Sequence, residues 1–127
     1  MNNHILILDD NEGILDALKL AFNEEGYRVT TLHHCDNIIQ KVLELEPDLV
    51  LMDYLLFGIN GGEYCHEIKT NPLTMHLPVI LMSGYPRVIE SLGDYGCNAF
   101  VAKPFELTNL LDTVKQHLPR KHELDYC

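Results

Sequence analysis

An uninterrupted apolar run, Ile5-Leu6-Ile7-Leu8, leads directly into a pair of acids, Asp9-Asp10. A strand with one face in water would alternate apolar and polar residues, but this run has no polar position. It therefore predicts a strand that is buried on both faces, as in a parallel sheet covered by helices. Because the two acids follow the last apolar residue, we expect them at the carboxyl end of that strand.

Short apolar runs of the same kind recur along the chain and alternate with amphipathic segments. The further predicted strands are residues 27–32, 49–52, 78–82 and 99–102. Apolar residues at helical spacing predict helices over residues 14–22, 38–43, 63–69, 88–92 and 107–118. We expect Asp36 to cap the second helix and residues 58–62 to form a flexible loop. The alternation predicts an α/β fold with a doubly wound, five-stranded parallel sheet.

The composition is that of a single globular domain and excludes several classes of protein. The chain has 127 residues, of which 46% are hydrophobic and 22% charged, so it is neither disordered nor fibrous. Its net charge of −10 would repel nucleic acids and anionic membranes. No apolar run approaches the roughly 20 residues of a membrane span, and the amino terminus lacks the features of a signal peptide. We therefore expect a cytoplasmic protein.

Residues with reactive or charged side chains follow four of the five predicted strands. Asp9 and Asp10 follow the first, Asp53 the third, Ser83 the fourth and Lys103 the fifth. In doubly wound folds, ligands bind outside the carboxyl ends of the strands, so we expect these side chains at one site. Three neighbouring carboxylates repel one another unless a cation lies among them. Mg²⁺ is the favoured cation, because it prefers oxygen ligands and no His or Cys is placed to compete.

The same residues are suited to binding and transferring a phosphoryl group. Lys103 supplies a fixed positive charge and Ser83 a hydroxyl donor, and a carboxylate can itself accept the phosphoryl group. Mg²⁺ and Lys103 would then neutralise the phosphoryl oxygens. Each residue alone has a simpler explanation, since an aspartate at a strand end often caps a helix. Their joint placement at strand ends carries the prediction.

The residues around these positions resemble the receiver domain of response regulators, the CheY-like family of two-component signalling. The resemblance rests on the Asp9-Asp10 pair and on residues 47–53, 77–84 and 96–105, and it spans residues 4–118. It implies a flavodoxin-like strand order of 2-1-3-4-5 with five helices. We expect residues 1–118 to form the receiver domain and residues 119–127 to be a short flexible tail.

The resemblance implies a role for each acid of the predicted site. Asp53 is similar to the phosphoacceptor, which takes the phosphoryl group onto a carboxylate oxygen and also binds the metal. Asp10 is similar to a direct Mg²⁺ ligand, and Asp9 to an acid that binds the ion largely through water. The backbone carbonyl of Leu55 is similar to the group that completes the metal shell.

The remaining matches concern the hydroxyl, the lysine and their neighbours. Ser83 resembles the hydroxyl that donates to the phosphoryl group, and Lys103 resembles the lysine that pairs with it. The Lys103-Pro104 bond is similar to the family's cis peptide, and Phe100 stands where the family has a switch aromatic. Phe100 has no hydroxyl, so a switch here would work by packing alone. Phe57 stands where proline is common, which predicts a less rigid loop.

By the same resemblance, the protein would be a signalling phosphoacceptor rather than an enzyme. Its only reactions would be Mg²⁺-dependent self-phosphorylation from small donors and autodephosphorylation. The phosphoryl group would come from the phosphohistidine of a sensor histidine kinase or from a phosphotransfer protein. The chain could be a free single-domain regulator, a relay intermediate or a receiver cut from a longer protein. We expect no output domain after residue 118, so the signal would pass to an unidentified downstream protein by direct contact. The expected contact face comprises the fourth helix, the fifth strand and the fifth helix, and a homodimer would use the same face. Neither nucleic acid nor a membrane is an expected direct partner.

Two other functions fit this fold class and stay open at this point. A small Mg²⁺-dependent phosphohydrolase would also form an aspartyl phosphate, but such enzymes usually carry a second acid two residues after the nucleophile. Leu55 occupies that position here. A flavin-binding electron carrier would need a hydroxyl-rich phosphate loop after the first strand. The stretch Asp9-Asp10-Asn11-Glu12 is acidic there and would repel a phosphate.

Overall fold

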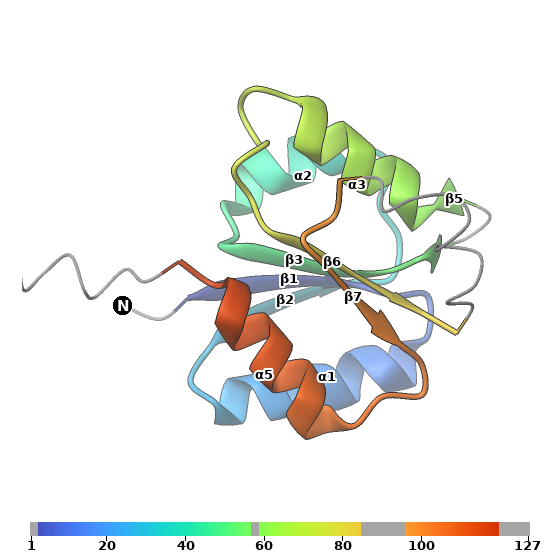
Figure 1. The fold of residues 1–127 in the computed structure, drawn as a ribbon, viewed down its shortest axis with the longest axis vertical. Helices are drawn as coiled ribbons and strands as arrows, with labels where there is room; N and C mark the ends of the chain where they lie inside the picture. Colours follow the sequence, from blue (N-terminus) through green and yellow to red (C-terminus); the bar gives the residue numbers. More distant parts are fainter. Residues whose placement is uncertain (1–2, 57–58, 85–95, 120–127) are drawn as a thin grey trace, which may run out of the picture.

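A computed structural model describes residues 3–56, 59–84 and 96–119 of the chain. Five parallel strands form one sheet in the order β2-β1-β3-β6-β7 (Figure 1). They are β1 (His4–Leu8), β2 (Arg28–Leu32), β3 (Leu49–Asp53), β6 (Val79–Ser83) and β7 (Ala99–Ala102). Within the sheet these are the first to the fifth strand along the chain, so the predicted fold and the order 2-1-3-4-5 are confirmed.

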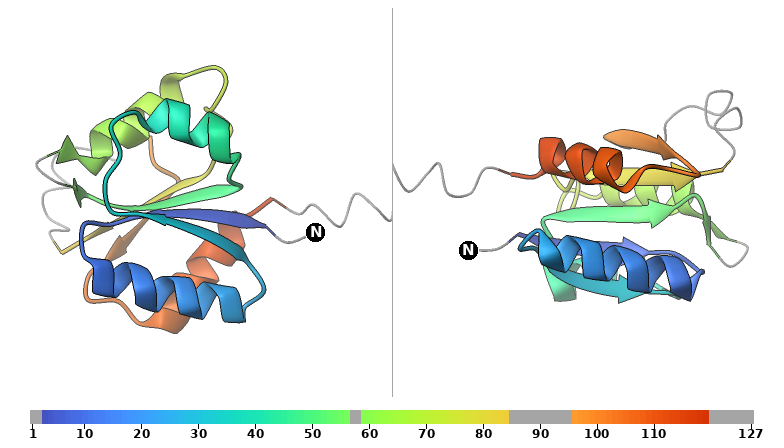
Figure 2. Two further views of the ribbon diagram at one scale, coloured as in Figure 1. Left: turned by 180° about the vertical axis from the view of Figure 1, so that it is seen from behind. Right: turned by 90° about the horizontal axis from the view of Figure 1, so that it is seen from below.

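Helices cover both faces of the sheet, as strands buried on both sides require. α1 (Glu12–Glu24) and α5 (Leu107–His117) lie on one face, whereas α2 (Ile38–Leu45) and α3 (Gly61–Thr70) lie on the other (Figures 1 and 2). The helix that we predict over residues 88–92 falls outside the described residues. Within the described part of the chain, no helix has the length and apolar character needed to cross a membrane.

The core consists of two apolar clusters, one on each side of the sheet. Every residue of β1, β3 and β6 is buried. Ile5 and Ile7 belong to the cluster beneath α1 and α5, whereas Leu6 and Leu8 belong to the cluster beneath α2 and α3. Each buried side chain of this size stabilises the fold by about 2 kcal/mol relative to exposure. An unbroken apolar run is therefore the stable sequence for a central strand here.

The connection between β3 and α3 differs from the flexible loop that we predict over residues 58–62. Leu55–Leu56 (β4) pairs antiparallel with Ile59–Asn60 (β5). α3 begins at Gly61, two residues before the predicted start at Glu63. This part of the prediction is wrong, because adjacent glycines indicate flexibility only where no packed neighbour fixes their backbone.

Close packing against β3 explains why glycine stands at the start of α3. The Gly61 N–H donates to the Tyr54 carbonyl at 2.6 Å. A Cβ on Gly61 would lie 2.2 Å from the Asp53 carbonyl oxygen, a distance that real Cβ atoms do not reach. Only glycine lets the helix approach the backbone of Asp53 this closely.

The start of α2 also differs from the prediction that Asp36 caps it. Asn37 is the N-cap, and its side chain accepts from the Gln40 N–H at 3.0 Å. The Asp36 carboxylate instead lies 2.7 Å from His34 Nε2. An amide oxygen caps a helix as well as a carboxylate does, so the sequence offered two adjacent candidates.

Candidate functional site

The parallel strands bring the predicted site residues to one edge of the sheet. Asp53 ends β3 and Ser83 ends β6, while Asp9 and Asp10 directly follow β1 and Lys103 directly follows β7. A backbone hydrogen bond of 2.7 Å from the Lys103 N–H to the Ser83 carbonyl holds two of these strand ends in register. The carboxyl edge of the sheet therefore gathers acids, a hydroxyl and a lysine.

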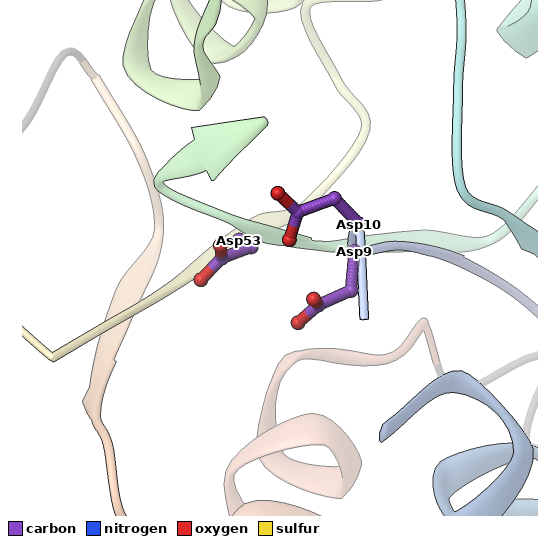
Figure 3. A group of neighbouring side chains, drawn as sticks. All are labelled: Asp9, Asp10 and Asp53. Atoms are coloured by element: carbon purple, nitrogen blue, oxygen red, sulfur yellow. The ribbon is translucent and has the colours of Figure 1, made fainter. Parts of the chain in front are cut away.

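Asp9, Asp10 and Asp53 form a compact acidic group. Each offers one carboxylate oxygen, and these oxygens all lie within 4.8 Å of one another. Figure 3 shows the three carboxyl groups gathered at the strand ends. Asp9 is 1% exposed and Asp53 is 9% exposed, whereas Asp10 is open to solvent. Two of the three negative charges are thus withdrawn from water, where charge repulsion is less well screened.

The ammonium group of Lys103 lies between two of these acids. Its Nζ is 2.8 Å from Asp9 Oδ2 and 3.0 Å from Asp53 Oδ1. The Lys103 side chain is 20% exposed, so both ion pairs are largely shielded from solvent. The peptide bond between Lys103 and Pro104 is cis. Three carboxylates and one ammonium leave the group with a formal charge of −2.

The pKa values of this group reflect a shortage of positive charge. Burial raises the pKa of the Asp53 carboxyl, and the charges of Asp9 and Asp10 raise it further, against the opposing effect of Lys103. Burial alone would lower the pKa of Lys103, but hydrogen bonds to Asp9 and Asp53 and their charges outweigh burial and raise it. Both directions are expected where buried carboxylates outnumber the cations among them.

The two acids that follow β1 use their oxygens differently. Asp9 Oδ1 accepts from the Asn11 N–H at 2.9 Å, and Asp9 Oδ2 accepts from Lys103, so both oxygens have protein partners. Asn11 also caps α1, where its side chain accepts from the Ile14 N–H at 3.1 Å. Asp10 is exposed beside them and is the acid most accessible to a ligand from solution.

This donor set fits a hard divalent cation. Among the described residues it is the one group of three or more potential metal ligands, and it offers carboxylate oxygens without imidazole or thiolate. Mg²⁺ binds through such oxygens and usually keeps several waters, whereas Zn²⁺ prefers nitrogen and sulfur. The formal charge of −2 on the group also matches a doubly charged ion.

The other residues singled out in the sequence lie at or beside this edge. Ser83 is buried at the end of β6. Phe100 lies beside Leu81 in the sheet, is half-buried, and packs against the cluster beneath α2 and α3. Leu55 begins β4, directly after Tyr54. Phe57 falls outside the described residues.

Two residues that the sequence analysis did not connect to the site help to shape it. Gly61 allows α3 to pack on the backbone of Asp53, and Asn11 donates its N–H to Asp9. The pair Gly61-Gly62, placed shortly after an acid at a strand end, is the signal that could have revealed the first. The second rests on a backbone group, which no side-chain pattern reveals.

Comparison with known proteins identifies the family. The family model of the response regulator receiver domain matches residues 5–115 of this chain. The chain belongs to this family. Sporulation initiation phosphotransferase F of Bacillus subtilis (strain 168) is 34% identical over 123 residues, which cover 95% of this chain and 98% of that protein. The predicted membership in two-component signalling is thereby confirmed.

Solved structures of receiver domains have the same fold. The response regulator TrrA from Thermotoga maritima, solved in complex with Mg²⁺ and BeF, is 29% identical with a TM-score of 0.81, over 91% of this chain and 99% of that one. The receiver domain of NtrX from Brucella abortus is 28% identical with a TM-score of 0.79, over 90% and 97% of the two chains. Receiver domains bind Mg²⁺ at an acidic pocket, and the acidic group of this chain fits such a pocket.

Proposed function

We propose that this receiver domain accepts a phosphoryl group on Asp53 from the phosphohistidine of a sensor histidine kinase or of a phosphotransfer protein. The observation that carries the proposal is the Lys103 ammonium, 3.0 Å from Asp53 at the carboxyl edge of the sheet. Asp9 also contacts Lys103, but both of its oxygens already have partners. Asp53 contacts Lys103 through Oδ1 and lies at the end of the central strand β3, facing the other two acids.

In the proposed step, a carboxylate oxygen of Asp53 attacks the phosphorus atom of the phosphohistidine. The phosphorus–nitrogen bond breaks, and its electron pair stays on the imidazole nitrogen of the donor. Lys103 neutralises charge on the transferred group, and the Ser83 hydroxyl donates a hydrogen bond to one of its oxygens. The product is an aspartyl phosphate, so the protein acts as a phosphoacceptor and not as a catalyst of repeated turnover.

The acidic group is proposed to hold Mg²⁺ during this transfer. Asp10 and Asp53 would bind the ion directly, and the backbone carbonyl of Leu55 would complete the protein ligands. Asp9 would bind through water, because Asn11 and Lys103 already occupy its two oxygens. When bound, the ion supplies positive charge that offsets the phosphoryl oxygens.

The signal is proposed to leave through the strand that carries Lys103. Ser83 and Lys103 would each gain a phosphoryl oxygen as a partner, and Phe100 on β7 would repack in response. The contact face would then comprise the predicted fourth helix, which falls outside the described residues, together with β7 and α5, and a homodimer would use it too. Amide NMR with a phosphoryl mimic should show shifts over residues 99–112 in the wild type that shrink in Phe100→Leu. Silent amides over these residues would contradict the switch.

Intact mass spectrometry after incubation with a small phosphodonor and Mg²⁺ tests the assignment of Asp53. The wild type and Asp16→Asn, which changes an exposed acid on α1, should each gain one phosphoryl group. Asp53→Asn should gain none, and full labelling of this variant would refute the assignment. Slow autodephosphorylation would let a receiver consume more than one equivalent of donor, so only loss of the phosphoryl group as fast as it is gained would favour the phosphohydrolase alternative.

A further inference from the structure

An apolar groove lies at the opposite edge of the sheet from Asp53. It runs between the carboxyl-terminal end of α2 and the 71–78 segment, which connects α3 to β6, and its volume is about 340 Å³. Its apolar lining consists of Val42, Leu43, Pro47, Leu73 and Leu77. We call it the α2 groove. Pro47 lies before β3 and Leu77 lies before β6, so the groove is at the amino edge of the sheet. Figure 1 shows β3 and β6 side by side.

Large apolar side chains at the walls of the α2 groove are unusually exposed. Leu43 is 45% exposed and Leu73 is 65% exposed, and Met75, in the same segment as Leu73, is 54% exposed. The exposed large hydrophobics of the described chain otherwise comprise Leu20 and Leu107. Exposed apolar side chains that lie together in this way often mark a binding surface, whereas single scattered ones do not.

The wall formed by the 71–78 segment is held in place by hydrogen bonds. The Thr74 N–H and the Met75 N–H both donate to the Asn71 carbonyl, at 3.0 and 2.8 Å. The Thr74 hydroxyl donates to the Ile68 carbonyl of α3 at 2.8 Å. The segment therefore presents Leu73 and Met75 in a preformed shape, which lowers the entropy lost when a partner binds.

The charge around the groove favours a basic ligand. Glu46 lines the groove and is exposed, and no described side chain forms an ion pair with it. The carboxyl-terminal end of α2, the negative end of its helix dipole, lies at the same place and has no basic residue in its last turn. Glu44 adds a further acid, although Lys41 approaches it at 3.6 Å.

We propose that the α2 groove binds a partner segment in which bulky apolar side chains are flanked by lysine or arginine. The apolar side chains would cover Leu43 and Leu73, and a basic side chain would approach Glu46. A second copy of this chain is a poorer fit, since it would bring another net charge of −10 to an acidic face. The site lies away from Asp53, so a ligand could occupy it without covering the acidic group.

Synthetic peptides test the proposal on the full chain. The probe is a fluorescent peptide with leucines at helical spacing flanked by lysines. One control peptide has glutamates for the lysines, and a second has alanines for the leucines. Binding is measured by anisotropy and mapped by amide NMR. The protein variants are Leu73→Ser, Glu46→Lys and, as a matched control on exposed apolar surface, Leu20→Ser on α1.

The leucine–lysine peptide should shift the amides of residues 42–47 and 73–77. Leu73→Ser should weaken its binding about tenfold, whereas Leu20→Ser should leave it unchanged. Glu46→Lys should weaken binding of the lysine peptide and strengthen binding of the glutamate peptide. Asp53→Asn should bind like the wild type, which separates this proposal from the proposed phosphorylation. Thermal unfolding of each variant shows whether it is folded.

Four results would overturn the proposal. The first is no binding up to about 1 mM peptide. The second is equal binding of the alanine peptide, which would reveal attraction by charge alone. The third is that amide shifts centre on the acidic group instead of the groove. The fourth is self-association of the free protein that Leu73→Ser abolishes, which would assign the groove to a second copy.

Discussion

The two edges of the sheet carry opposite kinds of chemistry. At the carboxyl edge, Asp9, Asp53 and Ser83 are polar side chains that lie buried. At the amino edge, Leu73 and Met75 are apolar side chains that lie exposed. Both arrangements cost free energy in the isolated protein, whereas the central strands β1, β3 and β6, which run between the edges, are buried along their whole length. The comparison shows that stability resides in the middle of the sheet and that each edge is suited to a ligand.

The largest effect is expected from adding one methyl group at the carboxyl edge. Gly61→Ala would place a Cβ 2.2 Å from the Asp53 carbonyl oxygen, so α3 or the end of β3 must move. We expect a stability loss of about 2–3 kcal/mol, measured by urea unfolding. Displacement of Asp53 should slow its phosphorylation by about 100-fold, measured by intact mass.

Gly84→Ala is the matched control for this change. Gly84 directly follows Ser83, and apart from its own chain neighbours no described residue has an atom within 4 Å of a Cβ built there. The free energy of unfolding and the phosphorylation rate of this variant should equal those of the wild type. If both glycine variants behaved alike, the close approach of α3 to Asp53 would not be what shapes the site.

The sequence contains enough information to place the strands and the groups at their ends. Unbroken apolar runs such as Ile5-Leu6-Ile7-Leu8 are stable only between two layers of helices, and parallel strands must align their carboxyl ends. The placement of Asp9, Asp53 and Lys103 at one edge follows from that alone. Their roles in phosphoryl transfer stay predictions.

Features that depend on close backbone contacts could not be predicted in this way. The packing of Gly61 against the backbone of Asp53 is a tertiary contact, whereas the sequence pattern of residues 61 and 62 by itself predicts flexibility. Asn37 rather than Asp36 caps α2 because the helical backbone begins at Ile38, and the sequence does not fix that starting point to within one residue. The α2 groove joins Leu43 to Leu73, whose proximity no local periodicity encodes.

The second effect concerns Mg²⁺ affinity at the carboxyl edge. Asp10→Ala should weaken Mg²⁺ binding by roughly tenfold or more, because an accessible direct ligand is lost. Asp9→Ala should weaken it less, since the oxygens of Asp9 are held by Asn11 and Lys103. Isothermal titration with Mg²⁺ measures both. An equal loss in the two variants would contradict the proposed division between direct and water-mediated binding.

The third effect separates the role of Lys103 in Mg²⁺ affinity from its role in phosphorylation at the same edge. Lys103→Met removes the cation that lies 2.8 Å from Asp9 and 3.0 Å from Asp53. Mg²⁺ should then bind about fivefold more tightly, because a competing positive charge is gone, while phosphorylation becomes slower. Weaker Mg²⁺ binding in this variant would show that Lys103 organises the acids instead of competing with the ion.

The smallest effect is expected at the amino edge. Leu73→Ser combined with Met75→Ser changes exposed side chains, so the free energy of unfolding should change by no more than about 0.5 kcal/mol. The rate of phosphorylation from a small donor should also stay unchanged. A clear decrease of that rate would show that the two edges are coupled, against the comparison drawn above.

Amide NMR of the wild type with and without beryllofluoride and Mg²⁺ tests the central claim most directly. Beryllofluoride mimics the phosphoryl group, so shifts should centre on Asp10, Asp53 and Ser83 and extend along β7 to Lys103. Residues 42–47 and 73–77 at the amino edge should stay unshifted, and Asp53→Asn should lose the response. Unshifted amides around Asp53 in the wild type, or the same shifts in Asp53→Asn, would contradict the assignment of Asp53 as the phosphoacceptor.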